Sequence, residues 1–91
     1  MGIEETSAMN EITLFPNPND GDMNVSFSLN NAQQVRLTVM DISGKELKST
    51  IINGRTGENV IMIDNTGIAS GVYFVRLNTE STDKTLQFIK N

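Results

Sequence analysis

Residues 17–22 gather the oxygen-bearing side chains that a hard cation would need, because Asn and Asp flank Gly21 on both sides. Calcium takes several carboxylate and carbonyl oxygens from one loop, so this segment is the first candidate for a binding site. Its spacing does not fit the EF-hand calcium loop. With Gly21 at the glycine position of that loop, the first ligand position is Pro16 and the final glutamate position is Phe27. We therefore interpret the segment as an ordinary turn and expect no metal site and no cofactor.

The chain has 91 residues, and none of them is Cys or His. Cysteine nucleophiles, Ser-His-Asp triads, His or thiolate metal sites and disulfides are therefore excluded. The 11 Asp and Glu residues fall mostly in or beside expected turns, where water solvates them, and no two are spaced as a general acid and base pair. We expect no catalytic residue and no enzyme activity.

Composition also restricts what the chain can bind. A net charge of -4 with only seven Lys and Arg argues against nucleic acid, whose phosphates call for clustered cations. Sugar sites usually stack sugars on aromatic faces, and the chain has no Trp, one Tyr and four Phe. The longest apolar runs, residues 60–63 and 72–75, are far shorter than the roughly 20 residues of a membrane-spanning helix. We expect no nucleic-acid partner and no transmembrane segment, and carbohydrate binding stays open.

Apolar and polar side chains alternate with a period of two along several segments, which is typical of strands with one buried face. Met23, Val25, Phe27 and Leu29 form the clearest example, and Val35, Leu37 and Val39 repeat it. Tyr73, Val75 and Leu77 are expected to face inward, while Arg76 faces water. Clusters of Asn, Asp and Gly separate the segments at intervals of roughly 8 to 12 residues, as in two-sheet sandwiches. One of them, residues 53–57, is expected to be a loop because of its two glycines. The expected fold is all-β, a seven-stranded antiparallel immunoglobulin-like β-sandwich. Its strands are expected at residues 12–15, 23–30, 35–39, 45–52, 59–64, 72–77 and 84–90.

Residues at the expected strand ends have structural interpretations. Pro16 and Pro18 fix an extended segment directly after Phe15 and should end the first strand. Tyr73 begins the sixth strand, where sandwich domains place a corner tyrosine whose hydroxyl bonds to backbone a few residues upstream. Residues 1–11 lack periodicity, and we expect them to be a flexible linker before a folded domain at 12–91.

Several short motifs follow one another in a characteristic order. Leu14-Phe15-Pro16-Asn17-Pro18 comes first, with Gly21 shortly after it. Residues 39–45 then read Val-Met-Asp-Ile-Ser-Gly-Lys, residues 68–77 read Ile-Ala-Ser-Gly-Val-Tyr-Phe-Val-Arg-Leu, and residues 88–90 read Phe-Ile-Lys. In this order and spacing, residues 12–91 resemble the type A C-terminal sorting domain of the type IX secretion system, found at the end of Bacteroidetes cargo proteins.

The resemblance implies that the domain is an address on a larger secreted or surface protein, which crosses the inner membrane by a separate N-terminal signal. The domain would be recognised in the periplasm by receptor components of the outer-membrane type IX translocon. A sortase-like cysteine peptidase would then cleave within the linker at residues 1–11, and the cargo would be released or attached to the cell surface. The final location would be the cell surface or the medium.

We expect the recognition surface to include the turn after the first strand, the corner before Tyr73 and the last strand. An edge strand at the C-terminus offers unpaired backbone groups, which could accept a receptor strand or form a weak homodimer. The alternative function is a fibronectin-like spacer or a carbohydrate-binding accessory domain of a secreted hydrolase. The candidate recognition residues are Pro16, Asn17, Pro18, Gly21, Gly44, Lys45, Gly71, Tyr73, Phe88 and Lys90.

Overall fold

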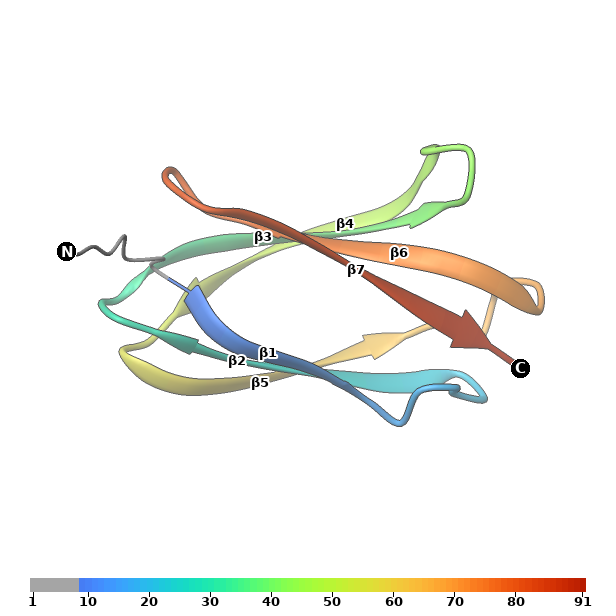
Figure 1. The fold of residues 1–91 in the computed structure, drawn as a ribbon, viewed down its shortest axis with the longest axis horizontal. Helices are drawn as coiled ribbons and strands as arrows, with labels where there is room; N and C mark the ends of the chain where they lie inside the picture. The colour runs from blue at the N-terminus through green and yellow to red at the C-terminus, as the bar shows by residue number, and fades with distance from the viewer. Residues whose placement is uncertain (1–8) are drawn as a thin grey trace, which may run out of the picture.

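The computed structural model describes residues 9–91, which form two stacked antiparallel sheets (Figure 1). One sheet has the order β1-β2-β5 and the other has the order β4-β3-β6-β7. The expected seven-stranded immunoglobulin-like β-sandwich is therefore confirmed. No helix within residues 9–91 is long and apolar enough to cross a membrane. The strands are β1 (Met9–Phe15), β2 (Asp22–Leu29), β3 (Gln33–Asp41), β4 (Glu46–Gly54), β5 (Gly57–Asp64), β6 (Gly71–Asn78) and β7 (Asp83–Lys90).

The core lies between the sheets and consists of side chains from alternate positions of the strands. Successive side chains of a strand point to opposite faces, so one apolar set from each strand can be buried. Tyr73, Val75 and Leu77 of β6 face inward as expected, while Arg76 is exposed. The buried apolar core is Met23, Val25, Phe27, Leu29, Val35, Leu37, Val39, Ile63, Tyr73, Val75, Leu77 and Phe88.

Several strand boundaries differ from the sequence-based expectation. β1 begins at Met9 instead of residue 12, and its first residues pair with the end of β2. Residues 53–57 were expected to be a loop, but β4 continues to Gly54 and β5 begins at Gly57. The two glycines suggested a turn, yet Gly54 pairs with Gln33, and its missing side chain leaves the space that Leu29 Cδ1 occupies. Gly54 therefore serves close packing. Gly57 has a φ of 94°, the left-handed conformation that favours glycine, and no atom within 4 Å of an added Cβ.

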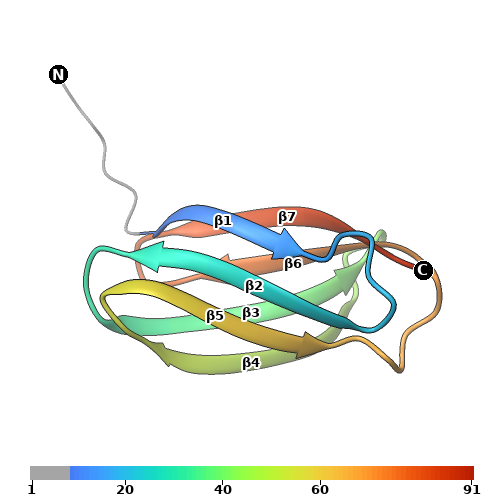
Figure 2. The same ribbon diagram turned by 90° about the horizontal axis from the view of Figure 1, so that it is seen from below.

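The chain alternates direction so that β1, β3, β5 and β7 all finish at the same end of the sandwich (Figure 1). This end carries residues 16–21, 42–45 and 65–70 together with Asn91, and we call it the C-terminal end of the sandwich. Met9 lies at the opposite end (Figure 1). β1 and β7, the outer strands of the two sheets, follow the same edge of the molecule (Figure 2).

The packing at Gly54 predicts a steric cost for any side chain there. A Cβ atom on Gly54 would collide with Leu29 Cδ1 and lie 3.1 Å from the carbonyl oxygen of Gln33. We expect Gly54→Ala to lower the free energy of unfolding by about 1–3 kcal/mol, measured by urea denaturation. The matched control is Gly67→Ala, because no atom lies within 4 Å of its added Cβ. An unchanged urea midpoint for Gly54→Ala would contradict this packing.

Candidate recognition surface at the C-terminal end of the sandwich

The structure brings all the candidate recognition residues to one end of the molecule. Pro16, Asn17, Pro18 and Gly21 connect β1 to β2 at this end. The other candidates lie in the β3–β4 turn (Gly44 and Lys45), at the start of β6 (Gly71 and Tyr73) and at the end of β7 (Phe88 and Lys90). Asp41, which precedes the β3–β4 turn, pairs with Tyr73, so the turn is next to the start of β6.

Residues 16–20 leave the three-stranded sheet and cross to the four-stranded sheet, and we call them the crossing segment. The backbone N–H of Asn19 donates to the carbonyl oxygen of Ile89 at 2.9 Å, and the N–H of Asn91 donates to the carbonyl oxygen of Asn19 at 2.8 Å. Asn19 and Lys90 thereby form a parallel bridge. β1 ends at Phe15, as the prolines predicted, but the chain then joins the edge of β7.

The side chain of Asn17 extends this pairing along β7. Its Oδ1 accepts the backbone N–H of Ile89 at 3.0 Å, and its Nδ2 donates to the carbonyl oxygen of Gln87 at 3.5 Å. Asn91 Nδ2 also donates to Asp20 Oδ1 at 3.0 Å. The backbone groups that β7 would offer to a partner strand near its end are therefore already bonded, and the open part of this edge is the first half of β7.

Asn19 connects three parts of the C-terminal end through one buried side chain, which is only 1% exposed. Its Oδ1 accepts the N–H of Gly21 at 3.1 Å, and its Nδ2 donates to the carbonyl oxygen of Ile89 at 3.2 Å and to Met23 Sδ at 3.5 Å. From sequence this amide stood out only as a potential cation ligand, and its structural role was not predicted. The alternation of Asn with Pro over residues 16–19 was the available signal, but it did not identify the partner strand.

Besides Gly21, three of the candidates are buried and shape the end from within. The Tyr73 hydroxyl donates to the carbonyl oxygen of Ala69 at 2.6 Å, which confirms the expected tyrosine corner. Its ring stacks on Phe88 with centroids 5.7 Å apart. Lys90 is 9% exposed, and its Nζ donates to the carbonyl oxygen of Asn91 at 3.1 Å. These side chains can hold the C-terminal end in shape, whereas the exposed turns can meet a partner.

The β3–β4 turn is fixed by the carboxylate of Asp41. Asp41 Oδ1 accepts the Ser43 hydroxyl at 2.6 Å and the backbone N–H groups of Ser43 at 2.9 Å and Lys45 at 3.0 Å. The Ser43 hydroxyl and then the Lys45 N–H lower the pKa of Asp41 below its ordinary value, because they stabilise the ionised form. Gly44 has a φ of 91°, a conformation that favours glycine. The turn therefore holds the exposed Lys45 in a defined place.

The β5–β6 loop packs on the β1–β2 connection. The N–H of Asn65 donates to the carbonyl oxygen of Gly21 at 2.6 Å. A Cβ atom on Gly21 would lie 2.7 Å from Thr66 Cγ2, so only glycine allows this approach. The Thr66 hydroxyl, bonded to Asp64 Oδ1 at 2.7 Å, lowers the pKa of that carboxyl. The Asn65 side chain is fully buried, and its amide has no hydrogen-bond partner among the described residues.

A polar hollow on the outer face of the three-stranded sheet lies away from these loops. Glu11, Thr13, Ser26 and Glu58 are among its lining residues, and Ser26 Oγ donates to Glu58 Oε2 at 3.2 Å. The aromatic residue beside it, Phe27, is 1% exposed and presents no platform for stacking a sugar. Within residues 9–91 no three His, Cys, Asp or Glu side chains are grouped to hold a metal ion.

These features define a small β-sandwich whose loops, corner and last strand are tied together at one end. A family model described as the secretion system C-terminal sorting domain matches residues 13–91. The chain belongs to this family, and it is a C-terminal sorting signal for type IX secretion. No curated protein matches the chain significantly.

The contacts of Asn17 predict a local effect on β7. We expect Asn17→Ala to lower the free energy of unfolding by about 1 kcal/mol and to speed amide hydrogen exchange at Ile89, because its N–H loses the side-chain acceptor. Exchange at Ile89 is measured by NMR. The control is Asn53→Ala, an exposed asparagine on β4 at the other edge of the same sheet. Equal exchange at Ile89 in both variants would disprove the Asn17 bond.

Proposed function

We propose that receptor components of the outer-membrane translocon recognise this domain in the periplasm, as a folded unit, through the C-terminal end of the sandwich. The observation that carries this proposal is that every candidate residue lies at that end, where the crossing segment is bonded to β7. A surface that is already ordered costs little conformational entropy when it binds. The exposed parts available to a receptor are the prolines at 16 and 18 and the turn at Gly44 and Lys45.

The same contacts argue against strand addition along the end of β7. A receptor strand would need the outward N–H and C=O groups of Ile89, and these are bonded to Asn17 and Asn19. β-strand addition depends on such free backbone groups. We therefore propose recognition through loops and side chains at the C-terminal end, with strand pairing restricted to the open first half of β7.

We also propose that the sortase-like cysteine peptidase cleaves on the N-terminal side of Met9. Residues 9–15 form β1, which pairs with β2 from Met9 onward, and a peptidase needs unpaired, extended backbone. The expected cleavage segment at 1–11 otherwise lies outside the described residues. β1 has seven residues, so its ends are about 20 Å apart, and the recognition end is separated from the cleavage region by that length. A receptor and a peptidase could then bind the domain at the same time, before the cargo is released or attached to the surface.

The direct test is a fusion of residues 1–91 to the C-terminus of a fluorescent reporter that is directed to the periplasm of a Bacteroidetes host. We expect the reporter outside wild-type cells, trapped in a translocon mutant, and trimmed close to the N-terminal side of Met9 by mass spectrometry. The reporter without the domain is the control and should stay inside. Equal retention of the fusion in both strains would reject the proposed recognition, and cleavage within residues 9–91 would reject the proposed cleavage position.

A further inference from the structure

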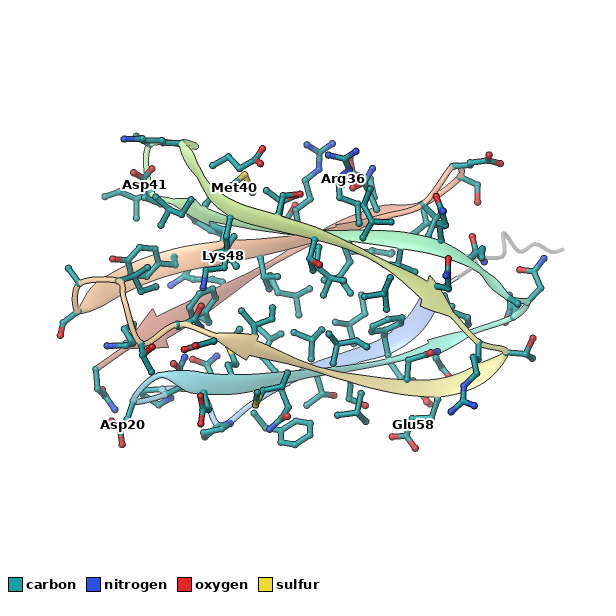
Figure 3. All side chains as sticks on the ribbon, turned by 180° about the vertical axis from the view of Figure 1, so that it is seen from behind. Asp20, Arg36, Met40, Asp41, Lys48 and Glu58 are labelled. Atoms are coloured by element: carbon teal, nitrogen blue, oxygen red, sulfur yellow. The ribbon has the colours of Figure 1, made fainter. Side chains whose placement is uncertain are left out.

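The outer face of the four-stranded sheet is divided into a polar half and an apolar half. Alternate residues of its strands point to this face, and the register aligns them in rows across the sheet. Figure 3 shows Arg36 and Met40 on the same outer side, with Met40 nearer to Asp41 and the C-terminal end. The polar half includes Arg36, Thr38, Arg76 and Asp83, of which Arg76 and Asp83 form an ion pair.

The apolar half lies at the C-terminal end, and we call it the apolar patch. Met40 pairs with Phe74, and Val72 pairs with Ile89, so these side chains are neighbours on one face, and the exposed Gln87 lies opposite Phe74 at the rim of the patch on β7. Leu47 extends the patch onto β4. Met40 and Phe74 are half-buried, whereas Leu47, Val72 and Ile89 are 38%, 39% and 41% exposed.

The sequence of β6 is unusual for a strand with one face in water. Its residues 72–75 are all apolar, and Val75 and Tyr73 fill the core while Val72 and Phe74 face outward. Continuous apolar runs are typical of strands that are covered on both faces. Contiguous apolar surface rimmed by polar residues marks interaction sites on small proteins. The outer side of β6 therefore has the character of a surface that a partner covers.

We propose that the apolar patch is the docking surface for a folded receptor component of the type IX secretion machinery, which covers it with an apolar surface of its own. This inference rests on the proposed recognition at the C-terminal end. The patch is continuous with that end, because Ile89 places its side chain in the patch while Asn17 and Asn19 bond its backbone. The crossing segment thus fixes the position of a patch residue.

The small size of the apolar patch and the net charge of the chain favour a receptor over a second copy of the chain. Stable protein interfaces use roughly 20–30 residues from each side, and the patch offers only a small fraction of that number. Two copies would also bring together two chains that each carry a net charge of -4. A small apolar contact supplemented by the neighbouring loops suits a transient complex, from which the sorting domain is released after use.

The test uses a double variant of the reporter fusion that carries both Val72→Thr and Ile89→Thr. Its control is the single variant Ile51→Thr. Threonine keeps the β-branched shape that strands favour, and Ile51 is exposed on the polar half of the same face beside Arg36. We expect the double variant to slow export by about tenfold or more, because it removes apolar area from the contact, while the control is exported normally. Thermal unfolding of the purified domains should show both variants folded.

Export of the wild-type fusion distinguishes a failure of the proposed recognition from a failure of the docking inference. If the wild-type fusion is not exported, the proposed recognition itself fails. If the wild-type fusion and the double variant are exported equally, the docking inference alone is overturned. Sedimentation of the purified domain tests whether a second copy of the chain covers the patch instead. If the wild-type domain is a dimer and the double variant is a monomer, the patch is a dimer interface and the inference of a receptor is overturned.

Discussion

The pairing of the crossing segment with the end of β7 is the contact on which the C-terminal end of the sandwich depends. β7 is the outer strand of its sheet, and β6 holds only one of its sides. The other side is held by residues that directly follow β1, a strand of the opposite sheet. These bonds join the two sheets at one edge and leave the last residues of the chain bonded on both sides. Unpaired strand edges invite other strands, so the same bonds also remove the second half of this edge, around Ile89, from uncontrolled pairing.

The arrangement explains how a short domain can act as an address. Tyr73, Phe88 and Asn19 are buried and fix the shape of the end, while the prolines and the Asp41–Lys45 turn are exposed on it. The exposed apolar residues of β6 and β7 continue this surface onto the sheet. An ordered end of this kind can be recognised without a folding step, and with the proposed cleavage before Met9 the length of β1 would separate recognition from cleavage.

The alternating pattern was sufficient to predict the seven strands and the inward residues of β2, β3 and β6, because period-two burial is a local property of the chain. The strand ends at Gly54 and Gly57 could not be predicted in this way. Glycine has the same local signature in a turn and in a strand that packs closely. At Gly54 only the contact with Leu29 decides between them, whereas Gly57 has a φ of 94° and no atom within 4 Å of an added Cβ. The partners of Asn17 and Asn19 are about 70 positions away along the chain, so no local pattern could reveal them. The sequence motifs identified the candidate residues, but only the strand topology shows that they lie together at one end of the sandwich.

The most direct measurement compares the export of two reporter fusions, one with Asn17→Ala and one with Gly54→Ala, at a temperature where both domains are folded. Asn17 bonds to β7 at the C-terminal end, whereas Gly54 packs at the opposite end of the sandwich. We expect the Asn17 variant to be exported more slowly than the wild type and the Gly54 variant to be exported at the wild-type rate. Equal export of the two variants, or slower export of the Gly54 variant, would contradict recognition through the C-terminal end.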